Sequence, residues 1–306
     1  WMVVESTLEK INRLPSGYPY FDRLLQNSHF IILGAVGPDY PYLSELLGQY
    51  FKIHSWADRM HYENTDGVIK HGVSSLKDYN GNDFDVCLSW LCGFATHLLT
   101  DAIIHPVVNA IVGPYMFNSG EHRKCEMTQD SLIFKNIKGV ELVYSDYLRQ
   151  LEMCSDPAER NKIHPAIKKL WTEALKASHP GGEEEFDKIQ PDKWHEDFLS
   201  KIDIAANPSP IAIFRHMEKM ADIVYKKTEE ISDSDKSKYY FNVRLPGGRT
   251  GNFEADAFNK AVDMIVQTWQ GLLNGIQNQD YTNCATSIKN WNLDTGVDSD
   301  VLTFWT

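Results

Sequence analysis

Cysteine is scarce in this sequence, and the scarcity limits what kind of protein it encodes. There are five cysteines in 306 residues, an odd number and too few for a disulfide scaffold. They are Cys87, Cys92, Cys125, Cys154 and Cys284. Cys87 and Cys92 are five positions apart, which is not the spacing of a metal knuckle. We expect the thiols to be mostly reduced, which favours the cytoplasm over a secreted location.

Positive charge and long apolar runs are also lacking. The 30 Lys and Arg residues are outnumbered by 42 Asp and Glu residues, giving a net charge of −12. This balance argues against a general nucleic-acid binder, which would carry a basic stripe. It does not exclude a phosphate-bearing substrate, because bound cations can reverse the local potential. We expect no transmembrane segment and no signal peptide, since no apolar run of spanning length and no basic segment followed by an apolar one is visible.

The sequence patterns predict an all-α fold. At 42% hydrophobic residues the chain can bury a large core, and we expect one helical domain over residues 1–306. Apolar residues recur at helical spacing in every long segment. Two short segments differ: Phe30–Leu33 resembles a strand, and residues 239–248 are expected to be extended. Gly67 and Gly72 are expected to mark loops.

The most informative segment is an apolar stretch around residues 93–106. His97, Asp101 and His105 follow each other at intervals of four within it. On an α-helix each such step turns the chain by roughly 400°, so the three side chains share one face. Polar groups on a buried helix are costly unless they are paired or bind a metal. A helix from residue 121 onward adds His122 and Glu126 at the same spacing, and a Gly- and Pro-rich turn presents Asp39.

Histidine and carboxylate together are the ligands of catalytic zinc and of similar divalent ions. The five helical candidates are too many for one tetrahedral ion and suit a site with two or three metals. A single histidine on an apolar face is more often a hydrogen-bonded core residue, and an i, i+4 pair is usually a surface pair. The spacing therefore predicts a metal site, built from residues 39–126, and leaves its chemistry open. No role is assigned to four histidines in charged or loop surroundings: His164, His179, His195 and His216.

At these residues the chain resembles the zinc-dependent phospholipase C family, which includes bacterial phospholipases C and a domain of glycosylphosphatidylinositol-specific phospholipase D. Zinc nucleases that act on single strands are structural relatives of that family. The resemblance covers roughly residues 30–130. Four motifs carry it: Leu33-Gly-Ala-Val-Gly-Pro-Asp-Tyr-Pro41, Trp56-Ala-Asp-Arg-Met-His61-Tyr62, Gly93-x3-His97-x3-Asp101-x3-His105-Pro106 and His122-x3-Glu126.

The resemblance implies which residues hold which ion. One zinc would take Asp39, His61, His97 and Asp101, and a second would take His105, His122 and Glu126. A third zinc in this family takes an N-terminal Trp, a nearby histidine and the bridging aspartate, here Asp101. Trp1 is present, but no histidine precedes His29. We therefore expect two zinc ions and a third position that is weak or altered.

The resemblance also implies an activity. We expect a metal-dependent phosphoric ester hydrolase of the phospholipase C type, with a phospholipid or a small phosphodiester as substrate and Asp39 as general base. One alternative is a phosphodiesterase that acts on single-stranded nucleic acid. For it, aromatic side chains could supply stacking platforms: Tyr40, Tyr42, Trp56, Tyr62 and Tyr115. The other alternative is a protein that binds metal and has lost catalysis. The head group and the oligomeric state are not fixed by the sequence.

Overall fold

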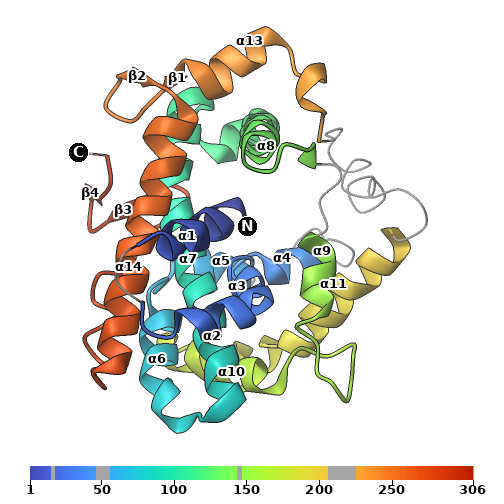
Figure 1. Ribbon diagram of the computed structural model, residues 1–306, viewed down its shortest axis with the longest axis vertical. Coiled ribbons are helices and arrows are strands. Elements are labelled where there is room, and N and C mark those ends of the chain that lie inside the picture. The colour runs from blue at the N-terminus through green and yellow to red at the C-terminus, as the bar shows by residue number, and fades with distance from the viewer. Residues whose placement is uncertain (15–17, 46–55, 143–146, 206–224, 306) are drawn as a thin grey trace.

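The structure is a computed structural model that describes all residues except 15–17, 46–55, 143–146, 206–224 and 306. In the described part of the chain nearly all regular structure is helical (Figure 1). The α-helices are α1 (Met2–Asn12), α2 (Phe21–Gln26), α3 (Ser28–Gly34), α4 (Tyr40–Glu45), α5 (Trp56–Tyr62), α6 (Gly67–Ser75), α7 (Gly81–Val112), α8 (Tyr115–Lys138), α9 (Tyr147–Glu152), α10 (Pro165–Ser178), α11 (Pro191–Ala205), α13 (Asp233–Lys236) and α14 (Asn259–Gln277). The all-α prediction is confirmed.

Shorter elements connect these helices. Short 3-10 or π-helical segments are η1 (Leu76–Asp78), η3 (Glu183–Lys188), η4 (Thr228–Glu230), η5 (Ser237–Phe241) and η6 (Phe253–Phe258). The strands are β1 (Val243–Arg244), β2 (Thr250–Gly251), β3 (Val297–Asp298) and β4 (Val301–Leu302). They form two antiparallel hairpins, in which Val243 pairs with Gly251 and Val297 with Leu302.

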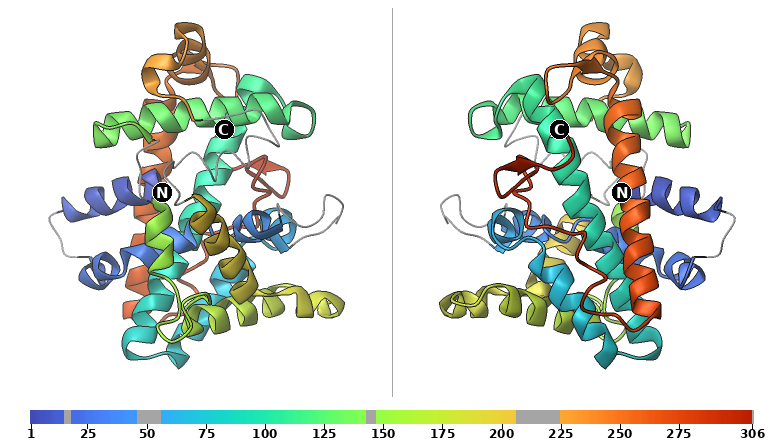
Figure 2. Two further views of the ribbon diagram at one scale, coloured as in Figure 1. Left: turned by 90° about the vertical axis from the view of Figure 1, so that its right-hand side faces the viewer. Right: turned by 90° about the vertical axis from the view of Figure 1, so that its left-hand side faces the viewer.

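Helix α7 is the axis of the fold. It runs along the long dimension of the molecule beside α14, and α8 crosses close to its C-terminal end (Figures 1 and 2). Its length and composition would suit a membrane span, but 83% of its most apolar window is buried inside the protein. That burial is typical of the core helix of a folded domain. One cluster of buried side chains surrounds α7 and extends from Val3 to Trp305.

Helix α3 shows where the sequence prediction was wrong. Residues 30–33 are not a strand but lie within α3, fully packed against α7. A short apolar run cannot be assigned to strand or helix by periodicity alone. Two glycines allow the close crossing: a Cβ at Gly34 would overlap the carbonyl oxygen of Trp90, and one at Gly93 would overlap that of Ile31. The crossing sets the height of the turn that follows α3 relative to α7.

Two other local predictions need correction. Gly67 begins α6 and Gly72 lies inside it, where a Cβ at Gly72 would press on Leu91, so neither glycine marks a loop. In the segment 239–248 only Val243–Arg244 is extended, because the preceding residues form the π-helical turn η5. The expected helix over residues 42–51 begins earlier, at Tyr40, and its later residues lie outside the described part of the chain, as does most of the helix expected at 208–230.

Candidate metal centre

Three helices and one turn bring the predicted ligands together. His97, Asp101 and His105 lie on α7, which is continuous from Gly81 to Val112 although Pro106 is inside it. His61 lies near the end of α5, and Asp39 ends the turn between α3 and α4. The remaining two candidates, His122 and Glu126, lie one helical turn apart on α8. All seven predicted residues thus surround the C-terminal half of α7.

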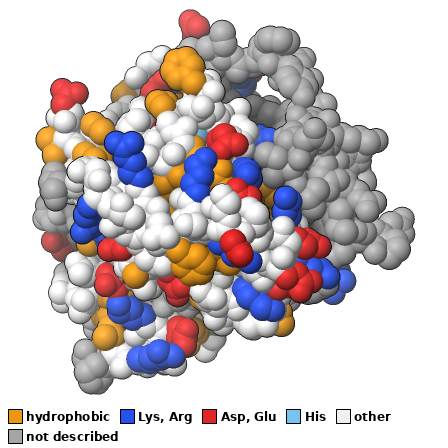
Figure 3. All heavy atoms as spheres, turned by 90° about the horizontal axis from the view of Figure 1, so that it is seen from above, with side chains coloured by type: hydrophobic (Ala, Val, Ile, Leu, Met, Phe, Trp, Pro, Cys, Tyr) orange, Lys and Arg blue, Asp and Glu red, His pale blue; other side chains and the backbone are white. Residues whose placement is uncertain are grey.

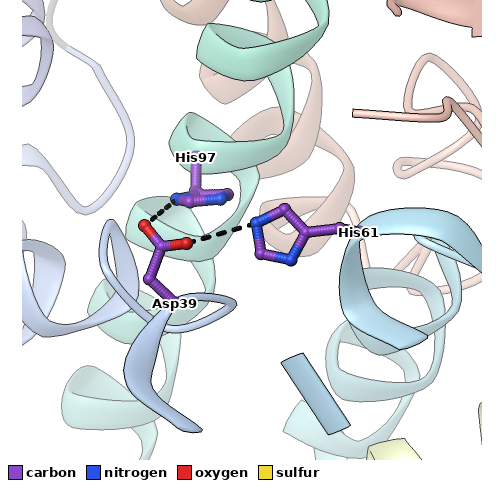
Figure 4. Close-up of side chains that lie close together, drawn as sticks. All are labelled: Asp39, His61 and His97. Carbon is purple, nitrogen blue, oxygen red and sulfur yellow. Dashed lines mark ion pairs between the residues drawn. The ribbon is translucent and has the colours of Figure 1, made fainter. Parts of the chain in front are cut away.

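The first cluster has Asp39 at its centre (Figure 4). One carboxylate oxygen of Asp39 is 3.2 Å from Nε2 of His61, and the other is 4.0 Å from Nδ1 of His97. Asp101 lies on the other side, with Oδ2 3.1 Å from Nε2 of His97 and 3.9 Å from Nε2 of His61. The candidate ligand atoms of Asp39, His61 and His97 all lie within 4.8 Å of one another.

The second cluster has Glu126 at its centre. Its Oε1 is 3.8 Å from Nε2 of His105 and 4.0 Å from Nδ1 of His122. Two ligand atoms on one tetrahedral zinc ion are roughly 3.3 Å apart, given Zn–N and Zn–O distances of about 2.0–2.1 Å. The separations in both clusters are within a few tenths of an ångström of that spacing, so small side-chain adjustments would complete two ligand sets.

The hydrogen bonds of the histidines show which ring nitrogen faces each cluster. Each of the four histidines has one ring nitrogen within hydrogen-bonding distance of a backbone carbonyl. The pairs are His61 Nδ1 with Ala57 O at 2.7 Å, His97 Nδ1 with Ala35 O at 3.0 Å, His105 Nδ1 with Leu293 O at 2.9 Å, and His122 Nε2 with Gly113 O. A carbonyl only accepts, so each of these nitrogens is the donor and the other nitrogen carries a lone pair when the ring is neutral.

This arrangement is typical of metal-binding histidines, whose outer N–H is held by a carbonyl or carboxylate. In all four cases the free nitrogen is the one that faces a carboxylate of its cluster. For His97 that nitrogen, Nε2, is buried and has no hydrogen-bond partner among the described residues. A buried polar atom left without a partner is costly, and a bound cation would remove the cost.

The electrostatics of the metal-free site are those of a cation-binding site. Burial lowers the pKa of His97, but the carboxylates of Asp101 and Asp39 outweigh it and raise that pKa to about 9. Burial raises the pKa of Asp101, but His97 and His105 outweigh it and hold the pKa well below its usual range. Burial raises the pKa of Glu126 to about 7, with His105 acting in the opposite direction. The clustered carboxylates therefore already hold positive charge on His97.

The site opens to solvent at its two central carboxylates. The side chain of Asp39 is 46% exposed and that of Glu126 is 36% exposed, whereas His61, His97 and His122 are buried. Two of the aromatic residues considered as stacking platforms, Tyr40 and Trp56, are core residues. Two others, Tyr62 and Tyr115, are exposed, and the ring of Tyr115 meets His122 edge-on at 5.4 Å.

The outer side of Asp101 faces Trp1. Burial lowers the pKa of the Trp1 amino group, while the carboxylates of Asp130, Glu5 and Asp101 act in the opposite direction. The hydroxyl of Tyr225 donates to Asp130 at 3.0 Å. The groups that act on Trp1 are thus carboxylates, in agreement with the expectation that no imidazole completes a third zinc position here.

The interpretation of His195 needs correction. It was placed in charged surroundings on the basis of its neighbours in sequence, yet it is fully buried, with Nδ1 2.6 Å from the Tyr40 hydroxyl and Nε2 2.9 Å from Ser155 Oγ. Burial lowers its pKa to about 4, so the ring is neutral. Tyr40 directly follows Asp39, and the anchor on His195 therefore fixes the turn that presents this carboxylate. His179 is also buried, His71 is exposed as expected, and His216 lies outside the described residues.

The sequence analysis missed one contribution to the site. A turn near the C-terminus places the Leu293 carbonyl against His105 and the Asp294 carboxylate 3.9 Å from the same ring. Nothing local signals this, because 188 positions separate Leu293 from His105. Asp294 follows Trp291-Asn292-Leu293, a segment without ligand spacing.

Comparison with known proteins identifies the family. A family model described as zinc dependent phospholipase C matches residues 1–181, more than half of the chain. This chain belongs to the zinc-dependent phospholipase C family. The match includes all seven predicted ligands, and the all-α architecture is that of the family. No curated protein and no solved structure matches the chain.

Proposed function

We propose that this protein is a zinc-dependent phosphoesterase of the phospholipase C type that hydrolyses a phosphodiester with water. The observation that carries the proposal is the common orientation of four histidines, each donating one N–H to a backbone carbonyl and facing a carboxylate with the other nitrogen. Core histidines need not share such an arrangement, whereas metal ligands do. The family match supports the same chemistry.

The ligand assignment follows from the two clusters. Asp39, His61, His97 and Asp101 are proposed to hold one ion. His105, His122 and Glu126 are proposed to hold the second. When bound, zinc supplies positive charge for the phosphoryl oxygens and lowers the pKa of a bound water towards neutrality.

Asp39 is proposed as the general base. It is the most exposed of the seven side chains for which an ion pair is recorded, so a substrate water can reach it. Burial raises its pKa, but His97 and His61 outweigh burial and lower it overall, so the carboxylate is ionised at neutral pH and able to accept a proton. The buried imidazoles beside it carry the positive charge that a phosphate ester needs for binding.

A phospholipid or other small phosphodiester is favoured as the substrate over single-stranded nucleic acid. The protein has a net charge of −12, and on the face shown in Figure 3 the described Lys and Arg side chains are interspersed with Asp and Glu. A strand-binding groove would need a continuous basic track. The exposed rings of Tyr62 and Tyr115 keep the nuclease alternative testable, since bases could stack on them.

The test is a turnover assay after metal removal. Protein treated with chelator should hydrolyse a chromogenic phosphodiester only when zinc is restored. His97→Ala and His122→Ala should each lose bound metal and activity together, and His71→Ala, which changes an exposed histidine, should lose neither. Comparing short-chain phosphatidylcholine with single-stranded DNA then separates phospholipase from nuclease. Stoichiometric zinc without turnover of any phosphodiester would show that the protein binds metal and has lost catalysis.

A further inference from the structure

The turn formed by residues 291–296 lies outside the residues matched by the family model, yet it reaches the metal centre. It follows α14 and precedes β3, near the C-terminal end of the chain. We call it the C-terminal turn. Its contacts are with α5 and α7, the two helices that carry four of the seven ligands.

Both peptide groups of one residue join the two ligand clusters. The Leu293 N–H donates to the carbonyl oxygen of His61 at 3.0 Å. The Leu293 carbonyl accepts from Nδ1 of His105 at 2.9 Å. Leu293 itself is fully buried. A rigid backbone bridge therefore connects a ligand of the first cluster with a ligand of the second.

Asp294 adds a carboxylate behind the His105 ring. Its Oδ2 accepts from the Tyr62 hydroxyl at 2.8 Å, and its backbone carbonyl accepts from the Asn109 amide. Its Oδ1 is 3.9 Å from Nδ1 of His105, the nitrogen that donates to Leu293. Glu126 lies at the other nitrogen, Nε2. Asp294 is therefore on the opposite side of the imidazole from the metal position and is not placed to be a ligand.

The turn is built so that it can approach α7 closely. Oδ1 of Asn292 accepts from the backbone N–H groups of Asp294 and Thr295, which closes the turn. Gly296 has a φ of +67° and lies against α7, where a Cβ would overlap the carbonyl oxygen of Ala102. Pro106 has no N–H to satisfy that carbonyl, so α7 is locally open at this point. Only glycine fits both the left-handed backbone and the contact.

We infer that the C-terminal turn is part of the metal centre and that Asp294 is a positioning residue for the second ion. The Leu293 carbonyl fixes the His105 tautomer, and the Asp294 carboxylate increases the electron density that the ring offers through Nε2. Outer carboxylates and carbonyls have this effect on metal-binding histidines in general. The inference rests on the proposed role of His105 as a ligand.

The first experiment compares two aspartate variants by zinc titration. Asp294→Asn removes the charge beside His105, and Asp300→Asn is the matched control, an exposed carboxylate six residues further along. Asp294→Asn should weaken binding of the second ion by about 10–100-fold and leave the first ion unaffected. Asp300→Asn should change neither affinity. Equal affinities of Asp294→Asn and wild type for both ions would overturn this inference and leave the proposed function intact, whereas wild-type protein that binds no zinc would overturn both.

The second experiment needs no metal. Nitrogen chemical shifts of the metal-free protein should show His105 with its proton on Nδ1 when the ring is neutral. Gly296→Ala should displace the turn and abolish that preference. Gly247→Ala is the control, because Gly247 also has a positive φ (+83°) but no neighbour within 4 Å of a Cβ. An unchanged His105 tautomer in a folded Gly296→Ala protein would contradict the positioning role of the turn.

Discussion

The protonation of His97 gives the sharpest quantitative prediction about the metal-free protein. Burial lowers the pKa of this ring, but the carboxylates of Asp101 and Asp39, 3.1 and 4.0 Å away, raise it from 6.5 to about 9. His97 is therefore expected to be an imidazolium at pH 7 when no ion is bound. Zinc binding must displace this proton, because only the neutral ring is a ligand.

The size of the effect follows from the shift. One pKa unit corresponds to about 1.4 kcal/mol, so displacing the proton at pH 7 should weaken zinc binding by roughly 100-fold relative to pH 9, or tenfold per pH unit. The same raised pKa stabilises the metal-free fold fully below pH 6.5, the ordinary value for histidine. That stabilisation is lost as the pH rises towards 9.

The assay is a histidine NMR titration of chelator-treated protein, combined with zinc competition measurements at pH 7, 8 and 9. In Asp101→Asn the pKa of His97 should fall towards its ordinary value and the pH dependence of the zinc affinity should become shallower. His71→Ala should leave both measurements unchanged. A His97 that titrates near 6.5 in the wild-type protein would refute the reasoning, as would a pKa that does not respond to the loss of the Asp101 charge.

Two further variants test the structural support of the site. His195→Ala removes the buried partner of Tyr40; it should lower the free energy of unfolding by about 1–3 kcal/mol and reduce turnover through a misplaced Asp39, and wild-type stability by denaturant titration would count against this role. Gly93→Ala should cost about 1–3 kcal/mol or more, because a methyl group would overlap the backbone of α3. Gly271→Ala on α14 has free space around its Cβ and should be neutral or slightly stabilising; equal denaturation midpoints for these two glycine variants would show that the α3–α7 crossing is not tight.

The local part of the site could be predicted from the sequence. Steps of four fix a common face on any helix, and this was sufficient to place His97, Asp101 and His105 together. A turn rich in glycine and proline was sufficient to expose Asp39. In contrast, the strand expected at Phe30–Leu33 is a helix, because its conformation is decided by packing against α7 and not by its own pattern.

Long-range support could not be predicted. The partner of His105 is a backbone carbonyl, and any residue type can supply one, so Leu293 left no trace in the sequence. His195 is flanked by polar neighbours and is nevertheless buried by contacts with Tyr40 and Ser155, which are far from it in the chain. Residues that position ligands are constrained by geometry and only weakly by residue type, which hides them from motif analysis.

The central claim is that two divalent ions bind on either side of the Asp101–His105 segment. Anomalous diffraction at the zinc edge, on crystals soaked in zinc, tests it directly. We expect two strong peaks, one among Asp39, His61 and His97 and one between His105 and Glu126, with a weak peak or none next to Trp1. The absence of a peak within bonding distance of either cluster would contradict the claim, and a third peak of equal height at Trp1 would contradict the two-ion stoichiometry.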